Sequence, residues 1–152
     1  MCRLVAFHAE KPRHAADLLI TDPHSLLVQS RCDRRGECHP DGWGVGYFLD
    51  GQPVAIRSAR PAFEDETWRP QIEPIETKTL LGHVRQASVG NRVLVNVHPF
   101  VHGRWVFMHN GTLTGFDHFR ADLEAEVDVD LLACRAGTTD SELVFYWLLS
   151  RL

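Results

Sequence analysis

A cysteine stands at position 2, and only Met1 precedes it. Methionine aminopeptidase removes Met1 when the next side chain is small, which would make Cys2 the N-terminal residue. Cys2 would then carry both a thiol nucleophile and an α-amine, and an amine with a pKa of about 7.7–8.0 can act as a general base near neutral pH. This is the arrangement of an N-terminal nucleophile. The alternative interpretation is a small apolar residue at the start of a strand.

A second candidate is the segment His109-Asn110-Gly111-Thr112, which follows the apolar run 105–108. The Asn110 amide and the Gly111 backbone N–H could both point at one developing negative oxygen, as in an oxyanion hole. Asn-Gly is also the strongest short signal for a hairpin turn. Taken alone, the pair favours the turn.

Two charged residues could bind a substrate that carries both an anion and a cation. Arg85 follows the strand-like run 79–84, and a guanidinium suits bidentate capture of a carboxylate. Asp140 could bind an ammonium group. The simpler interpretations are that Arg85 is a surface arginine and that Asp140 interacts favourably with a helix dipole.

The segment 41–46 has three glycines, which imply close backbone approach or positive φ. It lacks the lysine of a phosphate-binding loop, so we interpret it as a tight turn near a site. Cys32, Cys38 and His39 could form a metal site, but their spacing is not a usual zinc pattern. We therefore expect no metal and no cofactor, and keep a structural zinc as the alternative.

The elements that must position these residues follow a mixed pattern. Strands are predicted at 4–7, 45–49, 54–57, 79–84, 93–97 and 105–108, and helices at 13–20 and 116–126. Asp50-Gly51 predicts a hairpin turn, whereas 31–41 and 61–74 read as irregular. Thr139 and Glu142 match a capping box before an apolar face at Leu143, Trp147 and Leu148. This order favours an α+β fold.

Composition narrows the classes of protein. The chain has 152 residues, 44% of them apolar and 24% charged, which fits one globular domain. Its formal charge of −4 and the lack of a basic run argue against nucleic-acid binding. The apolar stretch 143–149 is far below the roughly 20 residues of a membrane helix. Without a signal peptide before Cys2, we expect a cytoplasmic protein with reduced cysteines.

Six segments in this order resemble the class II glutamine amidotransferase domain, and the likeness covers nearly the whole chain, 1–152. They are Cys2, HPDGWGVG at 39–46, GHVRQAS at 82–88, NVHPF at 96–100, HNGTLTGF at 109–116 and TDSE at 139–142. The resemblance is nearest to the stand-alone, YafJ-like branch. It implies the N-terminal nucleophile (Ntn) hydrolase fold, a four-layer αββα sandwich. The family domain usually continues well beyond residue 152, so the expected fold is incomplete at its C-terminus.

The resemblance also implies residue roles. Cys2 would attack the side-chain carboxamide of glutamine with its own α-amine as base, and Asn110 and Gly111 would hold the oxyanion. Arg85 would bind the α-carboxylate of the substrate and Asp140 its α-ammonium group.

Ser88 and His98 stand where the family has secondary contacts to glutamine. Two positions depart from the family pattern: Gln86 replaces an aromatic residue of synthase-linked relatives, and Val97 replaces a frequent threonine.

The leading functional hypothesis is a glutamine amide hydrolase that releases glutamate and ammonia. A hydrolase of another γ-glutamyl amide or peptide, as in ergothioneine synthesis, is the second. A non-catalytic partner or remnant domain is the third. A missing part of the sandwich would leave apolar faces for a partner chain or a second copy to cover.

Overall fold

A β-hairpin forms where the sequence predicts it. Strands β2 (Trp43–Leu49) and β3 (Gln52–Ser58) pair antiparallel on either side of Asp50 and Gly51. These two turn residues have φ angles of 50° and 78°. Positive φ at both positions gives the twist that a two-residue hairpin turn requires. The Asp-Gly pair therefore sets both the turn and the register of the hairpin.

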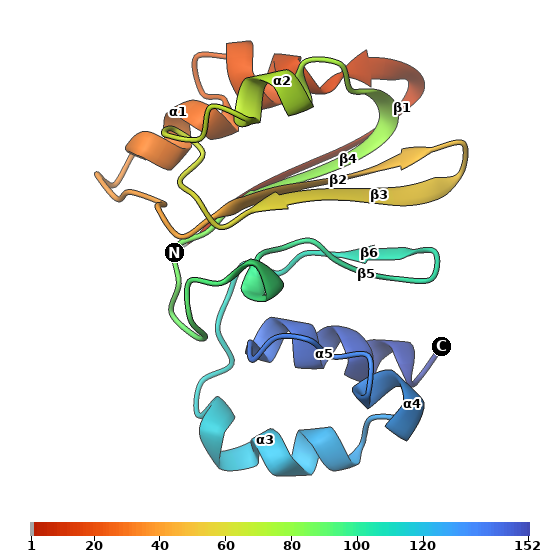
Figure 1. Ribbon diagram of the computed structural model, residues 1–152. Helices are drawn as coiled ribbons and strands as arrows, with labels where there is room; N and C mark the ends of the chain where they lie inside the picture. The colour runs from red at the N-terminus through yellow and green to blue at the C-terminus, as the bar shows by residue number, and fades with distance from the viewer. Residues whose placement is uncertain (1) are drawn as a thin grey trace.

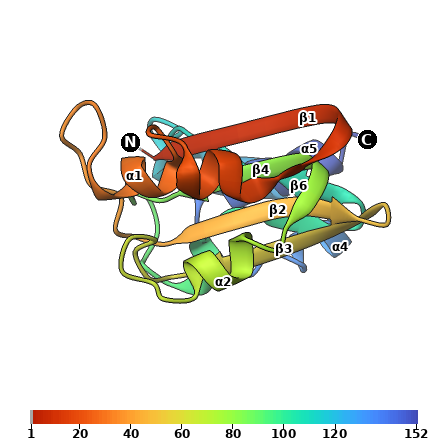
Figure 2. The ribbon, with the colours of Figure 1, turned by 90° about the horizontal axis from the view of Figure 1, so that it is seen from above.

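The computed structural model describes residues 2–152 and arranges them in four layers (Figure 1). Strands β1 (Arg3–His14) and β4 (Glu76–Val84) join the hairpin in an antiparallel sheet of order β1-β4-β2-β3. The outer layer on this sheet contains the π-helical turn η1 (Asp17–Thr21), α1 (Leu26–Arg31) and α2 (Trp68–Ile72) (Figure 2). The opposite face meets the hairpin β5 (Phe100–His102) and β6 (Trp105–Phe107), beyond which lie α3 (Phe116–Ala125), α4 (Val129–Leu132) and α5 (Asp140–Leu149). The predicted α+β class and αββα layering are confirmed.

The first core lies between the four-stranded sheet and its helices. Trp43 from β2 and Trp68 from α2 are fully buried, and their rings meet edge to face at 4.8 Å. The carboxylate of Asp65 accepts hydrogen bonds from Trp43 Nε1 at 2.9 Å and Ser58 Oγ at 2.5 Å. This buried carboxylate fixes the long connection from β3 to α2, which the sequence predicts as irregular with at most one helical turn.

The two sheets approach each other closely at β2. A Cβ atom on Gly44 would collide with the carbonyl oxygen of His98, and one on Gly46 would lie 2.7 Å from Val106 Cγ1. Such distances exclude a side chain unless a neighbour moves. The expected close backbone approach in 41–46 is therefore confirmed, and it is made to the second sheet.

A second core joins α3 and α5. Phe116, Val127, Leu143 and Tyr146 are buried together. The N-cap of α5 is Thr139, as predicted, and its Oγ1 accepts a hydrogen bond from the Glu142 N–H at 3.2 Å. The predicted apolar face is partly wrong. Phe145 and Tyr146 are buried, whereas Leu148 is 40% exposed.

Two predicted elements are wrong, and each has a reason in distant contacts. The predicted helix 13–20 is reduced to the turn η1, because Arg13 and His14 extend β1 and pair with Thr77 and Glu76 after a bulge. The predicted strand 93–97 is the 3-10 turn η2 (Leu94–Asn96), closed by a bond from the Val97 N–H to the Leu94 carbonyl.

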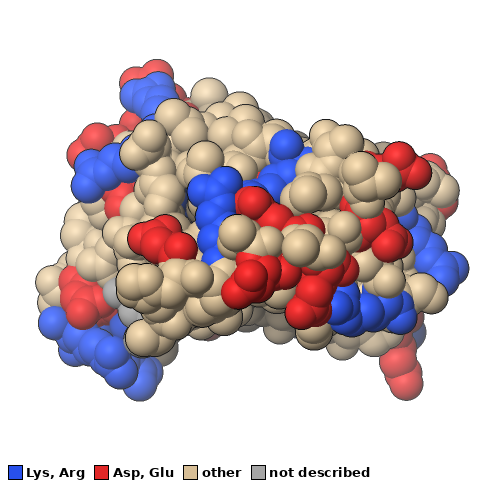
Figure 3. Space-filling model, turned by 90° about the horizontal axis from the view of Figure 1, so that it is seen from below, with Lys and Arg blue, Asp and Glu red and all other residues tan. Residues whose placement is uncertain are grey.

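In the described part of the chain, no helix is long and apolar enough to cross a membrane. On the face drawn in Figure 3, acidic and basic side chains alternate among the described residues and form no continuous basic surface.

The sheet contact predicts a difference between two glycine substitutions. Gly44→Ala should lower the free energy of unfolding by about 1–3 kcal/mol or more, because the obstacle is backbone. Gly46→Ala should be milder, because the Val106 methyl group it meets belongs to a side chain that can turn. Urea unfolding followed by tryptophan fluorescence measures both. If both variants lose the same free energy of unfolding, the close contact between Gly44 and the His98 carbonyl does not limit how the two sheets pack.

Candidate active site

Four segments that are distant in sequence meet around Cys2. They are the start of β1, the segment after β4, the segment after β6 and the first turn of α5. Together with His98, which lies just before β5, they line a pocket. Its lining residues are Cys2, Arg85, Gln86, Ala87, Ser88, Val89, His98, His109, Gly111, Thr139, Asp140 and Ser141. A second, larger pocket adjoins it, lined by Asn110 and Thr112 among others, and Cys2 lines both. The structure thus brings all the predicted site residues to one place.

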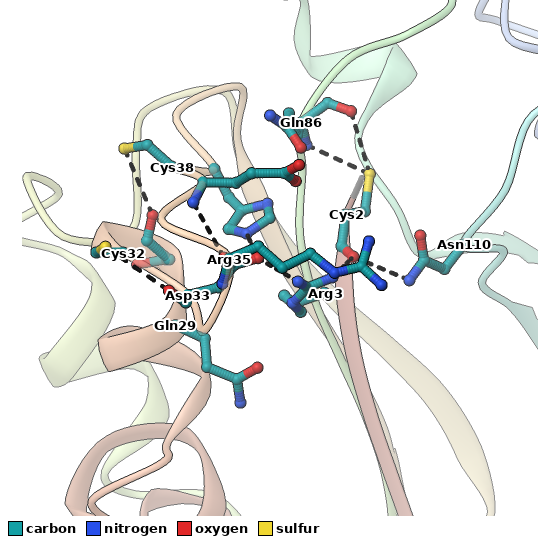
Figure 4. Close-up of polar contacts among 12 residues, drawn as sticks. Cys2, Arg3, Gln29, Cys32, Asp33, Arg35, Cys38, Gln86 and Asn110 are labelled. Carbon is teal, nitrogen blue, oxygen red and sulfur yellow. Dashed lines mark hydrogen bonds and ion pairs between the residues drawn. The ribbon is translucent and has the colours of Figure 1, made fainter.

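Cys2 is held at the end of β1 by its neighbour strand. Arg3 pairs with Val84 of β4, which places Cys2 beside the first residues after that strand. The thiol donates to the Gln86 carbonyl oxygen at 3.3 Å and accepts from the Gln86 N–H at 3.3 Å (Figure 4). The thiol is partly exposed and open to both pockets. Met1 lies outside the described residues, so its removal stays a prediction.

Asn110 lies beside Cys2 and not in a hairpin. Its Nδ2 donates to the Cys2 carbonyl oxygen at 2.9 Å (Figure 4). Among the described residues, β6 is paired only with β5, and the chain continues from Gly111 into α3. The φ of Gly111 is not positive, unlike that of a primed hairpin turn. The turn interpretation of Asn110-Gly111 is therefore wrong.

The first turn of α5 holds the Asn110 segment through two side chains. Asp140 Oδ2 accepts from the Leu113 N–H at 2.7 Å, and Ser141 Oγ lies 2.9 Å from His109 Nδ1. Asp140 is buried, which makes its contact a charge-assisted bond in a poorly solvated place. These bonds fix both ends of the segment that carries Asn110. Sequence reasoning did not single out Ser141 or His109, although both lie in matched motifs.

The last residue of the TDSE segment does not act as the capping box predicts. The Glu142 carboxylate accepts from the backbone N–H groups of Ala136 and Gly137, at 3.1 and 2.7 Å. It therefore ties the preceding loop to α5 instead of returning to the Thr139 N–H. Half of the predicted capping box is confirmed.

Arg85 is not a surface arginine, because it is only 3% exposed. Its guanidinium donates to the carbonyl oxygens of Val89, Gly90 and Asn91 at 2.9–3.2 Å. Burial lowers the pKa of Arg85, and the nearby Cys2 and Asp41 act in the opposite direction.

Asn96 joins the loop that binds Arg85 to the loop before α5. Its Nδ2 donates to the Asn91 carbonyl at 3.1 Å, and its Oδ1 accepts from the Thr138 N–H at 2.8 Å. Asn96 is buried in this position. It thereby sets the distance between the Arg85 and Asp140 sides of the pocket, a role that sequence reasoning missed.

Ser88 and His98 also line the pocket. Ser88 Oγ lies 2.6 Å from Thr112 Oγ1, which bridges the segments that carry Arg85 and Asn110. The His98 ring packs against His83 and Phe100, and within residues 2–152 neither of its nitrogens has a hydrogen-bond partner. Burial, with nearby positive charge, lowers the pKa of His98 to about 3.

The zinc alternative finds no support in the geometry. His39 Nε2 lies 3.2 Å from Asp33 Oδ2, and Asp33 also binds Arg3. Burial would raise the pKa of Asp33, but hydrogen bonds from Glu37, Arg35 and His39 and the charge of Arg3 lower it to about 2. Across residues 2–152, no three His, Cys, Asp or Glu side chains are grouped to hold a metal ion.

The four layers and a cysteine at the first strand's N-terminal end define the class: an N-terminal nucleophile hydrolase fold. The family model of the class II glutamine amidotransferases matches residues 1–152. The chain belongs to this family.

Its similarity to known proteins is distributed over the whole sequence. It is 31% identical over 163 residues to DUG3 of Saccharomyces cerevisiae, a probable glutamine amidotransferase, which covers 100% of this chain and 46% of DUG3. It is 37% identical over 116 residues to the gamma-glutamyl-hercynylcysteine sulfoxide hydrolase of Mycolicibacterium smegmatis, covering 73% and 51% of the two chains. YafJ of Escherichia coli is 34% identical over 119 residues, covering 75% and 43%.

A solved glutamine aminotransferase class-II domain protein from Silicibacter pomeroyi superposes with a TM-score of 0.71 at 27% identity. That match covers 99% of this chain and 55% of the solved one. The chain spans about half the length of the curated relatives it matches.

The buried histidines predict how stability depends on pH. His98 is neutral in the folded protein down to a pKa of about 3, whereas its unfolded pKa is 6.5. The contribution of neutral His98 to the free energy of unfolding is complete above pH 6.5. It is lost as the pH falls toward 3, because in that range His98 binds a proton in the unfolded chain but not in the folded protein. Burial depresses the pKa of His83 in the same direction.

Between pH 7 and pH 5, His98 alone should remove about 2 kcal/mol from the free energy of unfolding. His98→Gln should abolish that share of the loss in urea unfolding, whatever its effect at pH 7. His118→Gln, at an exposed position, is the control and should leave the pH dependence unchanged. An unaltered slope in His98→Gln would show that His98 titrates normally in the folded state.

Proposed function

We propose that this chain carries the catalytic half of a cysteine-nucleophile amide hydrolase that acts on glutamine and releases glutamate and ammonia. One observation supports this most strongly. The Cys2 thiol opens into a pocket lined by Arg85, Asp140 and Gly111, and Asn110 lines the adjoining pocket. Glutamine has an anion, a cation and a reactive amide, and the pocket has one group for each.

In the proposed reaction, the α-amine of the processed Cys2 takes the thiol proton, and the sulfur attacks the side-chain carbonyl carbon. The oxygen of the tetrahedral intermediate becomes negative and accepts hydrogen bonds from Asn110 Nδ2 and the Gly111 N–H. The C–N bond then breaks, and the nitrogen leaves as ammonia with the proton held by the amine. Water hydrolyses the resulting thioester, with the amine again as base, and gives glutamate.

The proposed substrate contacts follow the charges of the pocket. Arg85 would bind the α-carboxylate and Asp140 the α-ammonium group, with Ser88 and His98 as secondary contacts. Asp140 Oδ2 already accepts from Leu113, yet a carboxylate offers about four acceptor sites. A neutral His98 adds no positive charge near the ammonium group. The proposed reaction needs a reduced Cys2 thiol, which a reducing compartment maintains, and we propose that the protein acts in the cytoplasm.

A second candidate is hydrolysis of a γ-glutamyl amide with a larger amine than ammonia. The observation in its favour is the open pocket beyond Cys2, lined in part by Gln86, Ser88 and Thr112. Asn110 lines this space and Arg85 does not, so we place the leaving amine there. The relative from Mycolicibacterium smegmatis is named as a hydrolase of such a compound. A small-molecule substrate is common to both candidates.

The two candidates are tested by mass spectrometry and substrate comparison. With Met1 removed, 6-diazo-5-oxo-norleucine should add once, at Cys2, and Cys2→Ala should abolish the adduct and all ammonia release. Cys2→Ser retains the shape of the site and serves as the matched control for folding. A higher kcat/KM for γ-glutamyl peptides than for glutamine would select the second candidate. Retained Met1, or no adduct in a folded protein, would contradict both and favour a non-catalytic role.

Asn110 gives a separate prediction. Asn110→Ala should lower kcat about 10²–10³-fold with little change in KM, because the hydrogen bond that the variant lacks forms only in the transition state. Asn110 is exposed, so the thermal midpoint should change little. Thr112→Ala, nearby in the same segment, should affect kcat much less. An unchanged kcat in Asn110→Ala would exclude Asn110 from the oxyanion hole.

A further inference from the structure

The loop between α1 and β2 carries two thiols that the proposed reaction does not use. Cys32 and Cys38 are both exposed and unbridged. They are separated by five residues and lie beyond the pocket lining around Cys2.

Backbone hydrogen bonds bring the two cysteines together at the base of a loop. The Asp33 N–H donates to the Glu37 carbonyl at 3.0 Å, and the His39 N–H donates to the Ser30 carbonyl at 2.8 Å. Cys32 and Cys38 therefore flank a loop that the hydrogen bond between Asp33 and Glu37 closes at its base. A disulfide spans Cα atoms about 4.4–6.8 Å apart, and the closed base of the loop brings the two cysteines toward such a separation.

The thiols are also free to turn toward each other. Their sulfur contacts are long bonds to carbonyl oxygens, from Cys32 Sγ to Asp33 and from Cys38 Sγ to Ser30, both 3.7 Å. Figure 4 draws the two sulfur atoms on the same side of the loop, with Asp33 and Arg3 on the side toward Cys2. Since both residues are exposed, no core packing opposes a change of side-chain rotamer.

The charges around the loop favour an anionic reaction partner. Arg31, Arg34 and Arg35 are exposed and flank Cys32 within three positions. The Asp33 carboxylate is buried and already binds Arg3 and His39, so it does not neutralise these arginines. A small disulfide that carries carboxylates would be attracted to this loop.

We propose that Cys32 and Cys38 form a redox-active dithiol that closes to an intramolecular disulfide by exchange with an anionic low-molecular-weight disulfide. One protein thiolate attacks a sulfur of the small disulfide, forms a mixed disulfide and releases one small thiolate. The other protein thiolate then attacks the mixed disulfide and releases the second. Two protein thiols are oxidised, one small disulfide is reduced, and the protons pass to the two released thiols.

The loop is connected to the nucleophile through charged groups. Asp33 accepts from Arg3, whose other nitrogen donates to the Cys2 carbonyl oxygen at 3.2 Å. Asp33 Oδ1 also accepts from the Arg35 and Glu37 N–H groups, inside the ring that the disulfide would close. A change in that ring on closure would reach Asp33 and, through Arg3, the surroundings of Cys2. This consequence rests on the proposed function, whereas the dithiol itself does not.

The dithiol is tested in a Cys2→Ser, Cys134→Ser protein, which retains only the two loop thiols. Oxidised glutathione should lower the intact mass by about 2 Da and give a cross-linked peptide that contains Cys32 and Cys38. Adding Cys32→Ser or Cys38→Ser should instead trap a mixed disulfide on the remaining cysteine. Mixed disulfides on both cysteines without a cross-link would overturn the proposal. A neutral disulfide, bis(2-hydroxyethyl) disulfide, should react more slowly, and equal rates would exclude a role for the arginines.

The link to Cys2 has its own measurement. In Cys134→Ser, the rate of Cys2 alkylation by iodoacetamide should change severalfold after oxidation and return after reduction with dithiothreitol. An unchanged rate would overturn the link to Cys2. Neither assay uses glutamine or an amide substrate, so its failure is distinct from failure of the proposed hydrolase activity.

Discussion

The close contact between the two sheets determines the rest of this structure. Strand β2 has no side chain at Gly44 or Gly46, and the His98–Pro99 segment and β6 occupy that space. Sheets whose inner faces carry ordinary side chains pack about 10 Å apart. At Gly44 the two backbones nearly touch. His98 is therefore pressed against His83 of β4, and the chain leaving β6 reaches the edge of the first sheet where Cys2 lies.

Once the sheets are stacked, the first turn of α5 organises the site. Thr139 caps the helix, Asp140 and Ser141 bind the segment around Asn110, and Glu142 binds the loop before the helix. Hydrogen bonds to charged groups contribute roughly 1.5–3 kcal/mol each, so this turn can hold two loops against their conformational entropy. Four consecutive polar residues are buried at the start of an otherwise apolar helix because each has a separate backbone or side-chain partner.

The sequence predicts the features that depend on near neighbours. The Asp50-Gly51 turn and the Thr139 cap are decided within three or four residues, and both are confirmed. The helix predicted at 13–20 fails because Arg13 and His14 pair with residues more than sixty positions away, which local periodicity does not contain. The order of motifs predicts residues that the structure brings to adjoining pockets, whereas the links made by Asn96 and Ser141 depend on the three-dimensional arrangement.

Arg85 is a buried cation that is held by neutral backbone groups. Its guanidinium is held by three backbone carbonyl oxygens, and within residues 2–152 it forms no ion pair. The nearby carboxylate, Asp41, instead accepts from the Ala87 N–H at 2.7 Å and pairs with Arg92 at 2.6 Å. Carbonyl dipoles fix the orientation of the guanidinium but leave its charge uncompensated. In the function proposed above, the α-carboxylate of the substrate would supply the compensating charge through stronger, charge-assisted bonds.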